Sequence, residues 1–200
     1  MYIICIDLEG VLVPEIWQEL AKVTGLDDLR LTTRDMKSYK ELMDYRLNIL
    51  EREGLDGNHL MGVVSNMEPF KGAREFLDTL RKDYQVVILS DTFYELSQPL
   101  FVKLGYPTVF CHHLEVTEKK SILGYKIRLA EQKLRAVESF KSLNFNTIAI
   151  GDSYNDISML QSADLGILFS APKYIIDEYK ELKTSGTYLD LLKIIKYETR

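Results

Sequence analysis

The chain has 200 residues, 46% hydrophobic and 28% charged, with a formal net charge of −5 at pH 7, the composition of a soluble globular protein with one full domain and room for a small insert. The mild charge, without a long block of Lys and Arg or a basic stripe interleaved with aromatic residues, argues against a nucleic-acid partner. The apolar runs are too short to cross a bilayer and the N-terminus lacks a basic leader, so we expect a cytoplasmic protein with no membrane partner.

The apolar run from Tyr2 to Ile6 predicts a buried strand that ends at two carboxylates, Asp7 and Glu9. Such a run, rich in isoleucine, is typical of a strand covered on both faces in the middle of a parallel sheet. Ligands of open α/β sheets bind just past the ends of such strands. Alone, the DLEG sequence is more often an ordinary turn than a catalytic site, so its meaning depends on what later strands bring beside it.

Residues 14–69 carry helical periodicity and no strand pattern. Helices are predicted over residues 14–25, 39–54 and about 58–66, where apolar residues recur at helical spacing. These helices are either a simple crossover or an inserted unit, and their combined length exceeds what a crossover needs. We therefore predict a catalytic core of residues 1–13 and 70–200 with a helical insert between them.

The rest of the chain alternates between strand and helix patterns. Strands are predicted over residues 85–93, 107–111, 146–150 and 163–169, with a hairpin within 112–129 at the edge of the sheet; helices are predicted over 69–83, up to Gly105, over 131–143, after residue 156 and over 189–198. This alternation predicts an α/β fold with a doubly wound parallel sheet, a Rossmann-type core.

The two cysteines, Cys5 and Cys111, are too few for a disulfide framework in a chain of this length. Cys111 is followed by His112 and His113, but no second Cys or His pair lies at zinc spacing. We expect a buried thiol at Cys5, a loop thiol at Cys111, and two histidines in a solvated turn.

Three later signals accompany Asp7 along the chain. Ser90 follows the apolar run VVIL, Lys133 lies in the first turn of a predicted helix, and GDSYND at residues 151–156 follows TIAI. In this order they resemble the haloacid dehalogenase superfamily of aspartate-nucleophile phosphotransferases, and together they span nearly the whole chain. The resemblance implies that residues 14–69 form a small helical cap over the active site.

The resemblance also implies how the residues act. Asp7 is expected to form an aspartyl-phosphate, while Glu9, where most of the family has Asp, acts as general acid and then as general base. The side chains of Asp7 and Asp152 and the backbone carbonyl of Glu9 are expected to bind Mg²⁺, with Asp156 behind them. Ser90 and Lys133 would bind the phosphoryl oxygens.

Electrostatics supports the two positive charges expected in the site, Mg²⁺ and Lys133. Two carboxylates ~4 Å apart repel by roughly 4 kcal/mol at an effective dielectric near 20, so a site with four acids needs positive charge, and Mg²⁺ prefers carboxylate oxygens. Lys141 is a competitor for the lysine role. Lys133 is favoured because the first turn of a helix also attracts phosphate.

The short cap combined with DLEGVLVPE resembles the phosphoserine phosphatases. This implies that Glu15 meets the substrate ammonium and Arg46 its carboxylate, with Asn155 of GDSYND as a further substrate contact. The alternative for Glu15 and Arg46 is an ordinary solvated charge, and Arg34 and Arg52 lie nearby.

The strings DLEGVLVPEIW, VVILSDTFYE, FKSL and GDSYND most resemble the bacterial branch of these phosphatases that also transfers the phosphoryl group to homoserine. Asp91 and Thr92 follow Ser90 where ordinary phosphoserine phosphatases carry glycines after the serine. Asp91 therefore adds an acid beside the substrate, which would favour an amino group or an acceptor hydroxyl.

Three alternatives remain. The substrate could be another small phosphomonoester. A receiver-type signalling module also uses Asp, Mg²⁺, Ser or Thr, and Lys, but it is shorter, its phosphorylated Asp ends a later strand, and it lacks a helical insert. A non-catalytic binding relative would be expected to have lost one of the residues Asp7, Glu9, Lys133 and Asp152, and this chain retains all of them.

Overall fold

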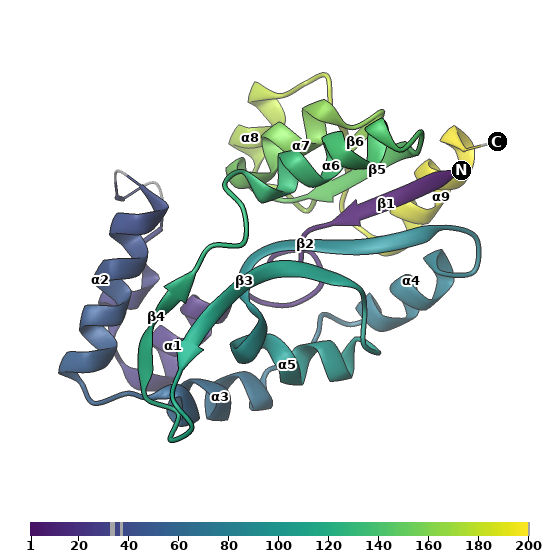
Figure 1. Ribbon diagram of the computed structural model, residues 1–200. Helices are drawn as coiled ribbons and strands as arrows, with labels where there is room; N and C mark the ends of the chain where they lie inside the picture. Colours follow the sequence, from purple (N-terminus) through teal and green to yellow (C-terminus); the bar gives the residue numbers. More distant parts are fainter. Residues whose placement is uncertain (33–34, 37, 200) are drawn as a thin grey trace.

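The structure is a computed structural model that describes residues 1–32, 35–36 and 38–199. Within these residues, seven strands form one sheet in the order β4-β3-β2-β1-β5-β6-β7 (Figure 1). The strands are β1 (Tyr2–Ile6), β2 (Gln85–Phe93), β3 (Val109–Val116), β4 (Ile122–Lys126), β5 (Asn146–Gly151), β6 (Leu165–Phe169) and β7 (Lys183–Ser185). All neighbouring pairs are parallel except β3 and β4. The predicted doubly wound α/β fold is confirmed.

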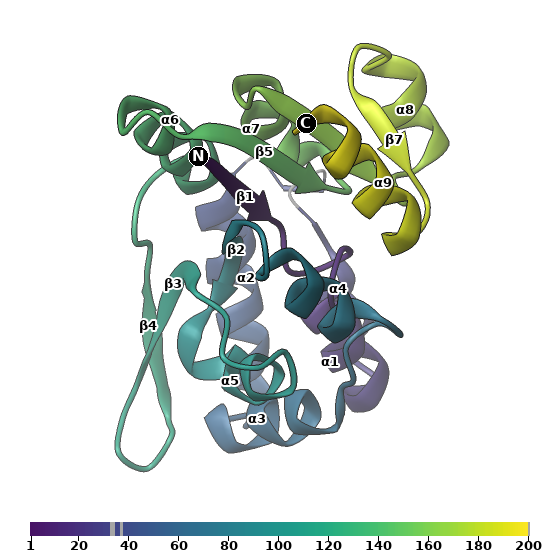
Figure 2. The same ribbon diagram turned by 90° about the vertical axis from the view of Figure 1, so that its right-hand side faces the viewer.

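Helices cover both faces of the sheet. The α-helices of the described residues are α1 (Ile16–Thr24), α2 (Tyr39–Arg52), α3 (Gly57–Asn66), α4 (Ala73–Leu80), α5 (Tyr94–Lys103), α6 (Gln132–Ser142), α7 (Ile157–Ser162), α8 (Lys173–Glu178) and α9 (Tyr188–Glu198). Helices α6, α7 and α8 lie on one face, and α4, α5 and α9 lie on the other (Figures 1 and 2). No helix in the described part of the chain is long and apolar enough to cross a membrane.

The alternation of side chains along β1 explains why both faces are covered. Ile4 and Ile6 belong to one hydrophobic cluster with α4, α5 and α9, whereas Ile3 and Cys5 belong to a second cluster with α6, α7 and α8. Successive strand residues point to opposite faces, so a strand that is apolar throughout must be buried on both. The predicted buried thiol of Cys5 is confirmed, and burial raises its pKa to about 12.

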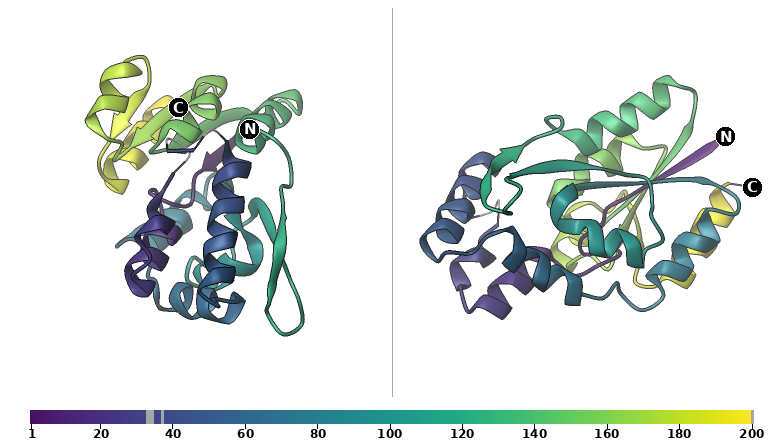
Figure 3. Two further views of the ribbon diagram at one scale, coloured as in Figure 1. Left: turned by 90° about the vertical axis from the view of Figure 1, so that its left-hand side faces the viewer. Right: turned by 60° about the horizontal axis from the view of Figure 1, so that its bottom comes forward.

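Helices α1, α2 and α3 lie beyond the carboxyl end of β1, and α3 packs against α5 (Figures 1 and 3). Ser38 caps α2 by accepting a hydrogen bond from the Glu41 N–H, and Asp56 forms a capping box with His59 at the start of α3. Their apolar side chains continue the cluster that includes Ile6. The division into a core and a cap of residues 14–69 stays a prediction.

Strand β3 differs from its prediction. It runs on to Val116 and pairs with β4, which confirms the edge hairpin but leaves no loop after Cys111. The expectation of a loop thiol and a solvated turn was wrong for Cys111 and His112, which are buried, whereas His113 is exposed. The reason is that β2 also continues past Ser90, and its last residue, Phe93, pairs with His112.

Candidate active site

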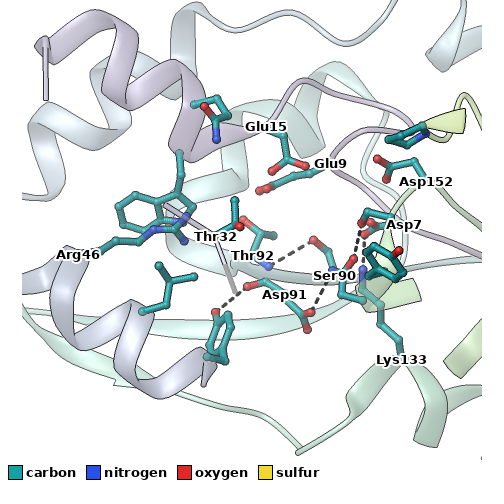
Figure 4. Close-up of a pocket in the computed structure, with 18 residues that line it drawn as sticks. Asp7, Glu9, Glu15, Thr32, Arg46, Ser90, Asp91, Thr92, Lys133 and Asp152 are labelled. Carbon is teal, nitrogen blue, oxygen red and sulfur yellow. Dashed lines mark hydrogen bonds and ion pairs between the residues drawn. The ribbon is translucent and has the colours of Figure 1, made fainter. Parts of the chain in front are cut away.

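Three adjacent strands bring the predicted site residues together. Asp7 follows β1, Ser90 and Asp91 lie near the end of β2, and Asp152 follows β5, so all four meet at the carboxyl edge of the sheet (Figure 4). They line a cavity of about 380 Å³ between the sheet and helices α1 and α2. The other predicted residues that line it are Glu9, Glu15, Arg46, Lys133 and Asn155.

Lys133 forms the centre of a buried ion-pair group. Its Nζ atom lies 2.8 Å from Asp7 Oδ1 and 2.7 Å from Asp156 Oδ1, and all three residues are almost fully buried. Burial opposes the charge of Lys133, but the Asp156 and Asp7 carboxylates hold its pKa well above its usual range. Lys133 therefore carries a positive charge beside Asp7, in the wall of the cavity.

Asp156 also contacts the turn that follows β5. Its Oδ2 accepts hydrogen bonds from the backbone N–H groups of Asp152 and Ser153, at 3.0 and 3.1 Å. A Cβ atom at Gly151 would overlap the Asp156 side chain, so the turn after β5 needs glycine there. Asp156 thus holds both Lys133 and the turn that carries Asp152.

The acidic residues fit a divalent cation. Oxygen atoms of Asp7, Asp152 and Asp156 lie within 4.8 Å of one another. Asp152 Oδ1 is buried without a hydrogen-bond partner among the described residues, and burial together with the Asp156 carboxylate raises the pKa of Asp152 to about 7. A single positive charge on Lys133 faces three carboxylates, and a hard cation with oxygen ligands would relieve the excess.

The predicted metal ligands differ in how the structure places them. The carboxylates of Asp7 and Asp152 belong to the acidic group, and Asp156 joins them, although its oxygens already accept from Lys133 and from backbone N–H groups. The Glu9 side chain is not part of this group. The prediction for Glu9 concerns its backbone carbonyl and stays a prediction.

The carboxyl groups of Glu9 and Glu15 lie next to each other in the cavity (Figure 4). Burial and the neighbouring Glu15 hold the pKa of Glu9 well above its usual range. Glu9 is half-buried and Glu15 exposed, and both line the cavity.

Arg46 is buried and not the solvated charge that was its alternative. Its guanidinium carbon lies 4.4 Å from the centroid of the Trp17 ring, and one Nη donates a 2.8 Å hydrogen bond to the Leu31 carbonyl. Its Nε is buried and has no partner in the described part of the chain, and burial lowers its pKa to about 10. A guanidinium with an unused donor beside a cavity suits a ligand carboxylate.

The predicted competitors lie elsewhere. Lys141 is partly exposed and pairs with Asp164, and Arg52 is exposed and pairs with Glu53. Neither lines the cavity. Arg34 lies outside the described residues.

Sequence reasoning missed several residues of the site. Gln132 donates hydrogen bonds to the Ser90 carbonyl and to Asp91 Oδ1, at 2.6 and 3.0 Å, and the Tyr39 hydroxyl donates to the Asp91 carbonyl at 2.9 Å. Trp17 and Thr92 also line the cavity. The one available signal was the position of Gln132 next to Lys133 in the first turn of a helix.

Comparison with known proteins gives one family. Residues 2–164 match the model of the haloacid dehalogenase-like hydrolases. The phosphoserine phosphatase ThrH of Pseudomonas aeruginosa is 50% identical over 191 residues, which cover 96% of this chain and 93% of the relative. A phosphoserine phosphatase of Pseudomonas syringae pv. tomato is also 50% identical over 191 residues, covering 96% of this chain and 81% of the relative.

A solved structure agrees with this result. The crystal structure of a phosphoserine phosphatase in apo form matches with a TM-score of 0.77 and 25% identity over 98% of both chains. The family model and the relatives each cover most of the chain, and the chain therefore belongs to the haloacid dehalogenase-like hydrolases.

Proposed function

We propose that this chain is a phosphoserine phosphatase that works through an aspartyl-phosphate on Asp7 and that it also transfers the phosphoryl group to homoserine. One observation carries the proposal: a single cavity has Asp7, Ser90 and Lys133 at one end and, at the other, the Nε of Arg46, which has no hydrogen-bond partner among the described residues (Figure 4). The relatives at 50% identity are named phosphoserine phosphatases, which supports the choice of substrate. We propose the cytoplasm as its location.

The two ends of the cavity suit the two ends of the substrate. Ser90 Oγ and the Lys133 ammonium can donate to phosphoryl oxygens. Arg46 can receive the substrate carboxylate through its Nε–H, to which the described part of the chain offers no acceptor. Glu15, Asp91 and Asn155 line the space between or beside them and are the proposed contacts to the rest of the amino acid.

In the first step, Asp7 attacks phosphorus and the bond from phosphorus to the serine oxygen breaks. Both contacts of the Asp7 carboxylate, from the Leu8 N–H and from Lys133, go to Oδ1, so we assign Oδ2 as the attacking atom. The departing oxygen takes a proton from Glu9. The raised pKa of Glu9 supports this role, because a general acid must hold its proton near neutral pH.

In the second step, Glu9 is a carboxylate and removes a proton from water or from the homoserine hydroxyl. That oxygen forms a bond to phosphorus while the bond between phosphorus and Asp7 breaks. The products are inorganic phosphate or phosphohomoserine, and Asp7 and Glu9 return to their starting protonation states.

Hydrolases of this family generally use a divalent metal ion, and we propose Mg²⁺. The side chains of Asp7 and Asp152 and the carbonyl of Glu9 would hold it, with Asp156 in support. When bound, it would neutralise charge on the phosphoryl oxygens. Asp156 is less suited to direct ligation because its oxygens already accept from Lys133 and two backbone N–H groups.

We also propose that residues 14–69 act as a cap on a core of residues 1–13 and 70–200. Helices α1 and α2 supply one wall of the cavity, with Glu15 just before α1 and Arg46 within α2. A wall made of inserted helices can keep bulk water from the phosphorylated Asp7.

The test is incubation of the protein with phosphoserine and Mg²⁺, with and without homoserine, and separate measurement of inorganic phosphate and phosphohomoserine. We expect phosphate without homoserine and both products with it, and no turnover by Asp7→Asn. Hydrolysis of an aryl phosphate without hydrolysis of phosphoserine would assign the enzyme to another phosphomonoester.

A further inference from the structure

Asp91 is a carboxylate of the cavity that the two steps above do not use. It follows Ser90 on β2, and 35% of its side chain is exposed. Among the described residues, no Lys or Arg lies within ion-pair distance of Asp91. Lys133, a nearby cation, forms its ion pairs with Asp7 and Asp156. A partly buried negative charge without a cation partner is costly unless a ligand supplies one.

One oxygen of Asp91 is fixed by its surroundings. Oδ1 accepts a 3.0 Å hydrogen bond from Gln132 Nε2, and His112 Nε2 lies 3.6 Å away. The Arg128 backbone N–H donates to His112 Nδ1 at 3.2 Å, so the neutral ring carries its proton on Nε2, toward Asp91. Gln132 and His112 are both buried. Oδ1 thus has a defined position.

Further contacts hold the residues around this oxygen. Gln132 also donates to the Ser90 carbonyl at 2.6 Å, and its own side-chain oxygen accepts from Arg128 Nε at 3.1 Å. On the cap side, the Tyr39 hydroxyl donates to the Asp91 carbonyl at 2.9 Å. Asp91 is therefore anchored from α6, β3 and α2 together, which is more support than a surface carboxylate needs.

The second oxygen, Oδ2, keeps capacity to accept. Its contact in the structure is a long one, 3.5 Å from Asn155 Nδ2, and a carboxylate oxygen can accept more than one hydrogen bond. Burial opposes ionisation, but the charge of Lys133 and the hydrogen bond from Gln132 lower the pKa of Asp91. Asp91 therefore offers a charged acceptor to the cavity at neutral pH.

We propose that Asp91 is a specificity-determining residue that binds the ammonium group of the amino-acid substrate and acceptor through Oδ2, and that Gln132 and His112 are positioning residues for it. The inference rests on the proposed function. Asp91 lies between Ser90, at the phosphoryl end, and Tyr39 of the cap helix that also carries Arg46. In phosphoserine and homoserine, the carbon that carries the amino group lies between the ester or hydroxyl oxygen and the carboxylate.

Glu15 does not make Asp91 redundant. An ammonium has three N–H donors and can serve both carboxylates. Glu15, however, is exposed at the rim of the cavity, where solvent and salt screen its charge. Asp91 is half-buried and ionised, and a charge-assisted hydrogen bond is stronger in such surroundings. The larger share of ammonium recognition is therefore assigned to Asp91.

The test uses Asp91→Asn, which keeps Oδ1 as an acceptor for Gln132 but removes the charge and makes the other terminal atom a donor. The preference is measured as the ratio of kcat/KM for phosphoserine to kcat/KM for its analogue without the amino group. We expect this ratio to fall about tenfold to a hundredfold, through KM for phosphoserine, with little change for the analogue. Asp83→Asn, at an exposed site before β2, is the matched control.

Two further variants separate the roles. Gln132→Met removes the donor to Oδ1 and should lower the same ratio by a smaller factor, while turnover of the analogue shows that the site is intact. Glu15→Gln should lower it less than Asp91→Asn does. Equal losses on both substrates in Asp91→Asn, or a ratio that changes only in Glu15→Gln, would overturn the assignment.

Failure of the proposed function gives a different result. If the unmodified enzyme does not hydrolyse phosphoserine, the same ratio is measured with phosphoethanolamine and ethyl phosphate. A preference for the amine that Asp91→Asn removes would support the role of Asp91 without the proposed substrate, and a preference that survives in the variant would overturn it.

Discussion

The backbone of Gly10 lies directly against the carboxylate of Asp152, so that a Cβ atom at position 10 would overlap both oxygens of that carboxylate. Gly10 also has a φ of +77°, a conformation that residues with a side chain rarely adopt. The loop after β1 and the turn after β5 therefore meet with no space for a side chain between them. The place of Asp152 in the site depends on this contact.

We expect Gly10→Ala to displace Asp152 and to lower activity far more than Gly25→Ala. Gly25 has a similar φ of +73°, but a Cβ atom there would meet nothing within 4 Å. Both variants should lose about 1 kcal/mol or more of stability from backbone strain. Denaturant midpoints measure the loss of stability in each variant, and kcat/KM measures the additional effect on Asp152. Equal kcat/KM values for the two variants would contradict the predicted displacement of Asp152.

Lys133→Met should destabilise the protein as well as inactivate it. The substitution leaves the buried carboxylates of Asp7 and Asp156 without their cation, and breaking a buried pair in this way costs about 3 to 5 kcal/mol. Lys141→Met removes a partly exposed pair and should cost ~1 kcal/mol or less. Urea unfolding of both variants measures the difference. Similar losses of unfolding free energy in the two variants would mean that the ion pairs of Lys133 stabilise the fold no more than a partly exposed pair does.

The sequence was sufficient to predict how the strands assemble the site. A strand apolar on both faces must lie inside a parallel sheet, and acids that follow such strands meet at one edge. This reasoning placed Asp7, Ser90 and Asp152 at one edge of the sheet, as the structure does. The helices of residues 14–69 were predicted with similar success because their apolar periodicity is strong.

The contacts between elements could not be predicted in the same way. The closeness of the Glu9 and Glu15 carboxyl groups (Figure 4) and the burial of Arg46 against the Trp17 ring depend on how α1 and α2 pack, which no local pattern records. Helix α8 and strand β7 were not predicted, and the three residues of β7 are too few to show a period. His112 was misplaced because its burial depends on the continuation of β2 beside it.

Metal binding should be visible without an assay of activity. Mg²⁺ that binds the native state alone stabilises it by RT ln(1 + c/Kd), where c is the Mg²⁺ concentration, so the melting temperature rises with the logarithm of that concentration once it exceeds Kd. We expect this shift in the unmodified protein and its loss in Asp152→Asn, which removes the charge of a proposed ligand whose Oδ1 atom is buried. Activity should disappear in chelator and return with Mg²⁺. Undiminished turnover in chelator would contradict the metal proposal.

Arg46→Ala should raise the KM for phosphoserine much more than the KM for an aryl phosphate. The lost charge-assisted contact is worth about 1.5 to 3 kcal/mol, or roughly tenfold to a hundredfold. Arg52→Ala, on the same helix but exposed and paired with Glu53, is the control and should leave both values unchanged. An equal rise for both substrates would show that Arg46 supports the fold of the cap and does not read the carboxylate.

Transfer to homoserine is expected because the second step needs only an oxygen that Glu9 can deprotonate in line with phosphorus. A pocket that holds serine differs from one that holds homoserine by a methylene, which changes binding by only ~1 to 3 kcal/mol. Water competes, so transfer requires that the bound acceptor and the α1 and α2 wall exclude it. With labelled phosphoserine, phosphohomoserine should rise and inorganic phosphate fall as homoserine increases. Inorganic phosphate as the sole product at every homoserine concentration would identify the enzyme as a phosphatase without transferase activity.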